Sequence, residues 1–99
     1  MSENIQDTAV NLVNYSEEDL NVAGTVTATT PASSVQAKIL SSFNKPIIYN
    51  VTDTAPNLVV NTGSGLNEAV NITTVGTVTQ NQKEVIESAT NSGSIVYNE

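Results

Sequence analysis

The chain has 99 residues, the size of one domain, and its ten acidic and three basic side chains give a net charge of −7. Lys38, Lys45 and Lys83 are the only basic residues, so the sequence lacks the cationic side chains that neutralise nucleic-acid phosphates or bind anionic membranes. It has no Cys and no His, which excludes disulfides, thiolate nucleophiles, Cys or His zinc sites and imidazole acid–base catalysis.

The first predicted element is a short helix that follows Asp7. The Asp7 carboxylate is placed to cap the free amides of a first helical turn. Ala9, Leu12 and Val13 then follow at the i, i+3 and i+4 spacing of one helix face. After this helix, apolar and polar or small side chains alternate over residues 22–28, which predicts a strand.

A longer helix is expected between Thr30 and Asn44. In this prediction Thr30 is the N-cap and Pro31 occupies the first helical position, while Asn44 ends the helix in a left-handed conformation. A short apolar strand at residues 46–51 follows the helix. The buried face of the helix is predicted from an apolar stripe that consists of Ala32, Val35, Ile39, Leu40 and Phe43.

Three blocks of this sequence occur a second time in the same order. Three collinear matches indicate a tandem duplication. It divides the single domain of residues 1–99 into repeat 1, at about residues 4–50, and repeat 2, at about residues 51–99. The matching pairs are residues 7–13 with 53–59, residues 24–27 with 76–79, and residues 47–50 with 95–98.

The second repeat predicts the same elements as the first. Asp53 takes the helix-cap position of Asp7, and residues 70–78 alternate as a strand does. A longer helix runs from about Asn81 to Gly93 and precedes a last strand. Residues 53–60 also fit an extended loop that leads into a short apolar strand.

Helix, strand, helix and strand, taken twice, predict an α/β fold. Successive strands that are joined by helices favour a parallel sheet with right-handed crossovers. Each strand with its helix takes roughly 20–29 residues, the length of a solenoid coil. We therefore expect two tandem repeats stacked as a small solenoid-like parallel sheet with helices. The alternative is an all-β sandwich in which the helical segments are loops.

The two ends of the chain match the junction between the repeats at residues 49–53. Residues 97–98 repeat residues 49–50, and residues 4–6 align with residues 50–52. A stack of repeats leaves an incomplete face at each end, which needs a cap or a partner. We hypothesise that these faces pair head to tail or dock on another sheet edge. The alternative is that the match is only a remnant of the duplication. The candidate end-face contacts are Asn4, Ile5, Gln6, Ile95, Val96, Tyr97 and Asn98.

Three stretches of the sequence, residues 49–55, 66–73 and 89–93, carry a family resemblance. The chain resembles a repeat found in many copies in large cyanobacterial surface or secreted proteins, and similar stretches occur in structural proteins of cyanophages. The resemblance implies an architecture and a virion or extracellular setting, and it implies no activity. Some large members also carry calcium-binding nonapeptides, but residues 61–65 of this chain lack the aspartates of that motif.

Few residue groups in the sequence suggest chemistry. Ser34 and Ser41 lie within helical reach of Lys38, as a Ser–Lys catalytic pair would, but an exposed polar helix face explains them as well. Residues 17–19 are all acidic and are read as a solvated turn before a strand rather than as a cation site. Tyr49 and Tyr97 occupy equivalent repeat positions, as core residues or as exposed contact anchors.

These observations predict a non-enzymatic structural protein without a cofactor or a bound metal. The first reading is a phage virion component, such as a capsid decoration protein, whose partner is a protein lattice. The second is a bacterial cell-surface protein whose copies assemble end to end, and the third is a carbohydrate-binding module. The first 20 residues carry no basic side chain and no apolar run reaches 18 residues, so we expect neither a classical signal peptide nor a membrane-spanning helix.

Overall fold

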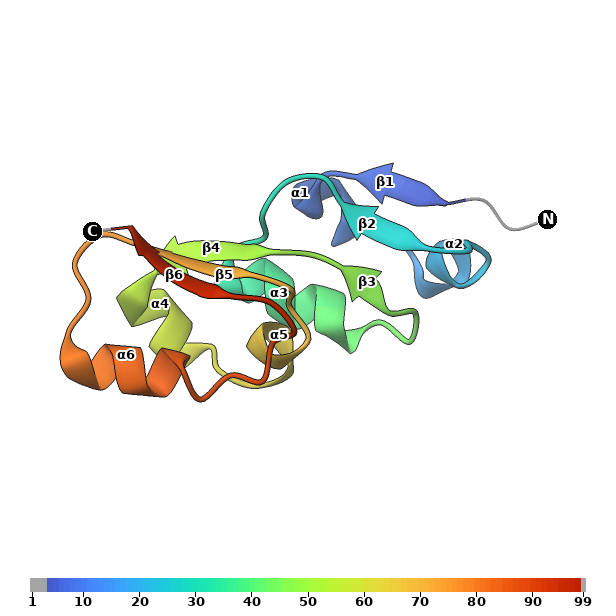
Figure 1. The fold of residues 1–99 in the computed structure, drawn as a ribbon. Coiled ribbons are helices and arrows are strands. Elements are labelled where there is room, and N and C mark those ends of the chain that lie inside the picture. Colours follow the sequence, from blue (N-terminus) through green and yellow to red (C-terminus); the bar gives the residue numbers. More distant parts are fainter. Residues whose placement is uncertain (1–3, 99) are drawn as a thin grey trace.

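The computed structural model describes residues 4–98 and is a mixed fold of short helices and parallel strands (Figure 1). In chain order its elements are β1 (Ile5–Asp7), α1 (Ala9–Leu12), α2 (Glu17–Asn21), β2 (Val26–Ala28), α3 (Ser34–Ser42), β3 (Ile47–Ile48), β4 (Val51–Thr54), α4 (Ala55–Val60), α5 (Ser64–Asn67), β5 (Ile72–Val75), α6 (Gln80–Ile86) and β6 (Ile95–Asn98).

The strands form two parallel sheets of three strands each, in the orders β1-β2-β3 and β4-β5-β6. The predicted α/β class with parallel strands is therefore confirmed, and the all-β sandwich is wrong. Each pair of neighbouring strands is joined through helices, as a parallel connection requires. In register across the sheets, Ile5 pairs with Val26 and Val26 with Ile47, while Val51 pairs with Ile72 and Ile72 with Ile95.

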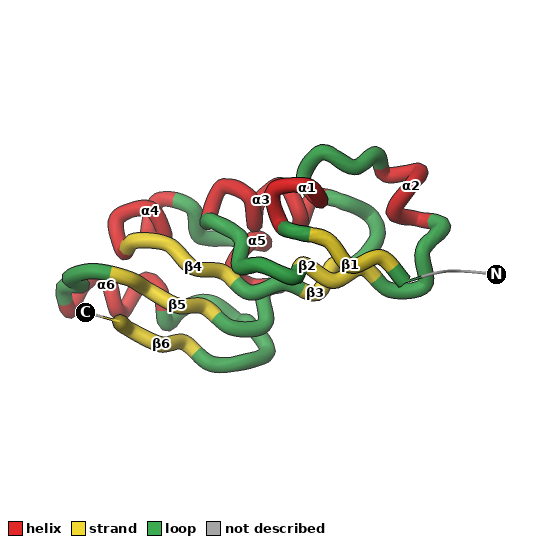
Figure 2. The backbone as a smooth tube through the Cα atoms, turned by 90° about the horizontal axis from the view of Figure 1, so that it is seen from above, coloured by secondary structure: helices red, strands yellow, loops and turns green. Residues whose placement is uncertain are grey.

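Strands β3 and β4 follow each other almost directly, so one run of chain serves both sheets. Ala32, just beyond β2, forms a parallel bridge with Val51 and ties β4 back to the first repeat. The second sheet is thus displaced along the strand direction (Figure 1) and turned about it relative to the first (Figure 2). This arrangement makes the molecule elongated, with extents of 48 × 20 × 19 Å.

The core lies between the strands and the helices, which cover one side of each sheet (Figure 2). Burying one Leu side chain contributes roughly 1.5–3 kcal/mol. A continuous row of such residues therefore holds the coils together. The fully buried large apolar side chains include Leu12, Leu20, Leu40, Leu58, Leu66, Ile72 and Ile86.

The same order of elements, strand, helix, helix, strand, helix, strand, occurs in residues 5–48 and again in residues 51–98. A shift of 46 residues carries Ile5 onto Val51 and Val26 onto Ile72, which hold the same sheet positions. The proposed match between residues 24–27 and 76–79 is wrong, because residues 76–79 follow β5 and lead into α6. The two four-residue segments are similar only in composition, and the strand register shows which residues of the two repeats are equivalent.

Asp7 and Asp53 are not the N-caps that the sequence predicts. The first helix begins one residue later, and the Thr8 side chain caps it by accepting from the Asn11 amide. Thr54 occupies the N-cap of α4 without a side-chain cap bond. Both aspartates belong to strands, so each carboxylate reaches forward from the strand end and accepts the next residue's amide at 2.8 Å.

The predicted N-cap of α3 is also wrong, and its predicted buried face is only partly correct. Ser33, rather than Thr30, is the N-cap and forms a capping box with Gln36. Val35 and Ile39 of the predicted stripe are exposed, whereas Leu40 is buried as predicted, and the helix also buries Ser34 and Ala37. The buried face is shifted because the second repeat packs on the small side chains of α3, a contact between residues distant in sequence.

Two short helices replace segments predicted as turn, strand or loop. Residues 17–19 begin α2, which Ser16 caps by accepting from the Asp19 amide, and Ser64–Asn67 form α5. The predicted strand over residues 22–28 shortens to Val26–Ala28 as a result. No helix in the described range 4–98 is long and apolar enough to cross a membrane.

Candidate contact surfaces

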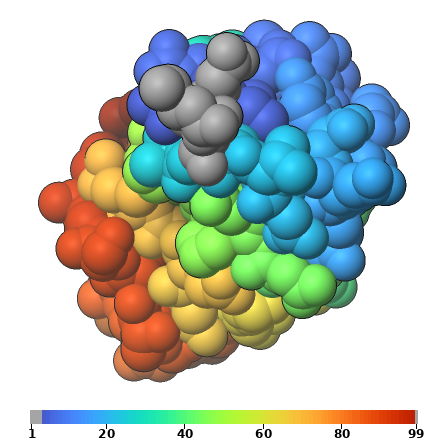
Figure 3. Space-filling model, turned by 90° about the vertical axis from the view of Figure 1, so that its right-hand side faces the viewer, coloured from blue at the N-terminus to red at the C-terminus, as the bar shows by residue number. Residues whose placement is uncertain are grey.

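The predicted end-face residues lie on the outermost strand of each sheet. Ile5 and Gln6 belong to β1, which Asn4 directly precedes, and Ile95, Val96, Tyr97 and Asn98 form β6. The two groups are at opposite ends of the molecule, near the N and C labels (Figure 1). In Figure 3 the first coil (blue) and the last coil (orange to red) likewise occupy opposite sides. One molecule therefore does not bring the two groups together.

Asparagine side chains hold successive coils at the start of the strands. Asn50 Oδ1 accepts from the Asn71 amide at 3.1 Å, and Asn71 Oδ1 accepts from the Ser94 amide at 2.9 Å. In the first repeat, Asn4 Oδ1 accepts from the Thr25 amide at 3.2 Å. The predicted contact residue Asn4 therefore already has a structural role within the chain.

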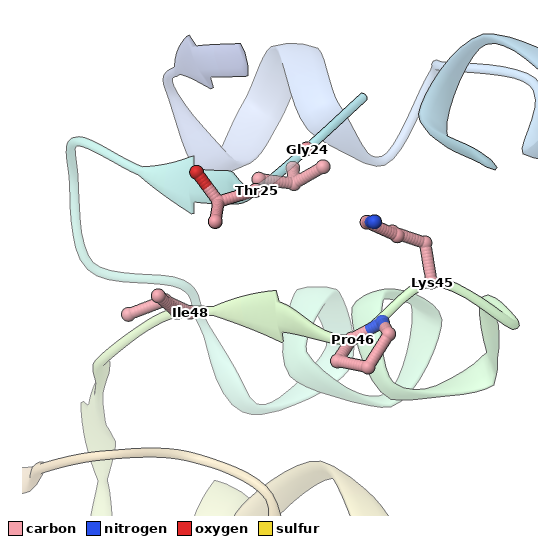
Figure 4. A pocket seen from close by; sticks show the side chains of 6 residues that line it. Gly24, Thr25, Lys45, Pro46 and Ile48 are labelled. Carbon is pink, nitrogen blue, oxygen red and sulfur yellow. The ribbon is translucent and has the colours of Figure 1, made fainter. Parts of the chain in front are cut away.

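A hollow of about 210 Å³ opens in the first repeat between the starts of β2 and β3 (Figure 4). Its lining is mainly apolar, and Lys45 contributes its only charged side chain. The lining residues are Gly24, Thr25, Val26, Lys45, Pro46 and Ile48.

The second repeat explains why this hollow exists. There the equivalent turns are closed by Gly93, whose amide donates to the Val70 carbonyl at 2.7 Å, and by the bond from Ser94 to Asn71. A Cβ at Gly93 would lie 2.6 Å from the Val70 oxygen, so only glycine allows this approach. The first repeat has Lys45 in place of Gly93 and Pro46 in place of Ser94, and Pro46 has no amide hydrogen to donate.

The outward faces of the two sheets carry no charged side chain within the described strands. Strand residues alternate between the helix side and the outer side, and the outer ones are polar, β-branched or both. Ile48, Val75 and Val96 are large apolar members of this set and are exposed. The outward residues are Gln6, Thr27 and Ile48 on the first sheet, and Thr52, Thr54, Thr73, Val75, Val96 and Asn98 on the second.

The joint between the two repeats is formed by α3 and α5. Gly65 of α5 lies against the α3 backbone, where a Cβ would be 2.9 Å from Lys38 N and 3.0 Å from Ala37 C. The buried Tyr49 hydroxyl donates to the Gly65 carbonyl at 2.5 Å, and burial raises the pKa of this phenol strongly. Ser41 Oγ and Ser64 Oγ are 3.0 Å apart across the same joint.

Asp53 adds a polar connection to this joint. Its Oδ2 accepts from both the amide and the hydroxyl of Ser34 in α3, at 2.9 and 2.7 Å. Its Oδ1 accepts from Asn57 Nδ2 at 2.9 Å. Burial alone would raise the pKa of the Asp53 carboxyl, but the hydrogen bonds from Asn57, Ser34 and Thr54 outweigh burial and lower it.

The structure also places the residues that suggested chemistry. Ser34 is fully buried and donates to Asp53, and Ser41 pairs with Ser64, so both serines serve the joint between the repeats, whereas the Lys38 side chain is exposed. No group of three or more metal-binding side chains comes together within residues 4–98. Sequence reasoning missed Gly65, and it treated Ser34 as a catalytic candidate or an exposed side chain and not as part of the joint. An alignment at the 46-residue shift would have paired Gly65 with Asp19 and marked the difference.

Comparison with known proteins gives no assignment. No family model, no curated protein and no solved structure matches this chain.

Proposed function

We propose that this chain is a non-enzymatic structural protein that acts by protein–protein contact, as a decoration or other accessory component of a phage particle. The outer sheet faces support a contact function. These faces carry no charged side chain although the chain has a net charge of −7. The centres of protein interfaces are likewise depleted of charged residues. The virion setting rests on the resemblance of residues 49–55, 66–73 and 89–93 to phage structural repeats.

The second sheet offers the larger of the two outer faces. Thr52, Thr73 and Val96 form one row across its three strands, and Thr54, Val75 and Asn98 form the next. Backbone hydrogen bonds hold these rows on adjacent strands, so little conformational entropy is lost when a partner covers them. Such a face suits repeated docking on a protein lattice.

Association with particles is the first test. Particles isolated on a density gradient from the producing culture are analysed by mass spectrometry, and we expect this chain among the stoichiometric components. Its absence from purified particles, with the chain present in the remaining lysate, would overturn the virion assignment.

A matched pair of variants tests the contact face. Val75→Lys introduces a charge on the central strand of the second sheet's outer face, and Val35→Lys introduces the same charge on the exposed side of α3. Added to particles that lack the chain, the Val75→Lys protein should bind at least about tenfold more weakly, since an unpaired interface charge costs more than 1.4 kcal/mol. Equal binding of the two variants would place the contact elsewhere.

A further inference from the structure

Helix α6 is the counterpart of α3 in the last coil, and it differs where α3 forms the joint. The capping boxes of Ser33 with Gln36 and of Thr79 with Gln82 align the two helices at the 46-residue shift. At this shift the joint residues Ser34, Ala37 and Ser41 of α3 correspond to Gln80, Lys83 and Glu87. Small side chains that admit a neighbouring coil are thus replaced by long polar or charged ones.

These long side chains provide the contacts that a following coil would otherwise make. Tyr49 donates to the Gly65 carbonyl of the following coil, and Tyr97 is its counterpart in the last coil. Its hydroxyl donates instead to Glu87 Oε2 at 2.7 Å, and Lys83 Nζ lies 5.1 Å from the centre of its ring. Burial and the bond to Glu87 raise the pKa of Tyr97 to about 12.

The first coil carries corresponding changes. At the 46-residue shift, Asp19 of α2 occupies the position of Gly65, and Glu18 occupies that of Ser64. Even the Cβ of an alanine at Gly65 would lie 2.9 Å from backbone. The larger carboxylate of Asp19 therefore cannot enter a joint of this geometry.

The polar bond that crosses the joint also has a local substitute in the first coil. Asp53 accepts from Ser34 of the preceding coil, whereas Asp7 accepts from the Tyr15 hydroxyl at 2.9 Å within its own coil. Hydrogen bonds from Asn11, Thr8 and Tyr15 lower the pKa of Asp7. The Asp7 carboxylate therefore needs no donor from another molecule.

Charge opposes the same contact between two copies. Stacked as the repeats are, two chains would bring Glu84 of α6 and its C-cap Glu87 next to Glu18 and Asp19 of α2, with Lys83 as the basic side chain on the α6 surface. Like charges about 4 Å apart repel each other by about 1 kcal/mol per pair in water, and by more when they are partly buried.

From these substitutions we propose that the stack is closed at both ends. Two groups of side chains act as end caps and prevent copies from adding end to end through the interface that joins the two repeats. One is Lys83 with Glu87, in and directly after α6, and the other is Glu18, Asp19 and Tyr15 in the first coil. This proposal is independent of the proposed function. It predicts that partners are met by the sides of the stack, and it argues against head-to-tail pairing of the kind hypothesised from the sequence.

The test opens each end separately with residues taken from the internal joint. One protein carries Lys83→Ala and Glu87→Ser, and a second carries Glu18→Ser and Asp19→Gly. Sedimentation velocity over a wide range of concentration should show a monomer for the unaltered chain and for each opened protein alone. An equimolar mixture of the two should double the mass of the sedimenting species, and a protein with all four changes should form longer chains.

Two results would overturn the proposal. One is end-to-end association of the unaltered chain, located by cross-links between α6 and α2. The other is a monomeric mixture of opened proteins whose circular dichroism and cooperative melting show that they are folded. If an opened protein fails to fold, Glu87→Gln and Asp19→Asn retain the size of the side chains. These charge-only proteins should stay monomeric in the same mixture, because the steric block remains, and a dimer would contradict the steric part of the proposal.

Discussion

The hydroxyl of Thr74 is a buried polar group without a hydrogen-bond partner among the described residues. Thr74 points to the core from the central strand β5, between Asp53 on one side and Tyr97 on the other. The carboxylate of Asp53 is already occupied by Ser34, Asn57 and Thr54, and the Tyr97 hydroxyl is engaged with Glu87. An unsatisfied buried hydroxyl costs about 1–3 kcal/mol.

Thr74→Val should therefore stabilise the protein. Valine has nearly the shape of threonine and removes the unsatisfied group, so we expect a gain of about 1 kcal/mol in the free energy of unfolding. Urea denaturation measures this change. Thr73→Val, one residue earlier on the outer side of the same strand, is the control and should change stability by less than about 0.5 kcal/mol. A loss of stability in Thr74→Val would mean that the hydroxyl has a partner, such as a buried water.

The close approach of α3 and α5 depends on one glycine. Gly65→Ala forces the two helices apart, because the new Cβ would lie 2.9 Å from Lys38 N. Overpacking of this kind costs about 1–3 kcal/mol. The matched control is Asp19→Ala at the equivalent position of α2, where the side chain is exposed and only a modest helix-end charge effect of about 0.5 kcal/mol is lost. Equal losses in thermal unfolding would contradict the structural role of Gly65.

The link between β4 and α3 should make stability depend on acid pH. The pKa of folded Asp53 lies below its usual value, so its contribution is fully present above the unfolded pKa of about 3.9. That contribution is lost as the pH falls through the lower folded value. Asp53→Asn removes it, so the difference in unfolding free energy between the two proteins should be largest at neutral pH and should narrow below about pH 4. A difference that is independent of pH would contradict this assignment.

Elements formed by local signals are the ones that sequence reasoning can find. The helical spacing of Ala9 and Leu12 predicts α1, and the alternation around Ile72 predicts β5. The face of α3 cannot be predicted in this way, because Ser34 and Ala37 are buried by the second repeat and Val35 and Ile39 are left exposed. Ser34 is covered by Asp53 and Asn57, and Ala37 lies against Gly65, so the burial of both depends on second-repeat residues that are distant in the sequence.

For the molecule as a whole, the duplication predicts the parallel α/β stack because a repeated strand–helix unit can bury its apolar side only against its copy. The candidate contact residues at the two ends follow from the same reasoning. Their role in contact stays a prediction, and the structure shows that β1 and β6 are edge strands. The closure of these ends could not be predicted without the register. It becomes visible only when Lys83 is aligned with Ala37 and Asp19 with Gly65.

The run of chain that contains β3 and β4 has a consequence for how a protein of this design lengthens. The run from β3 to β4 completes the first sheet and starts the second. Further copies of the unit can therefore be inserted between residues 50 and 51, and each new coil would meet its neighbour through a joint like that of α3 and α5. The outermost coils then keep their charged side chains and remain the two end caps. Growth of the gene would extend the middle of the molecule, and both of its extremities would stay as they are.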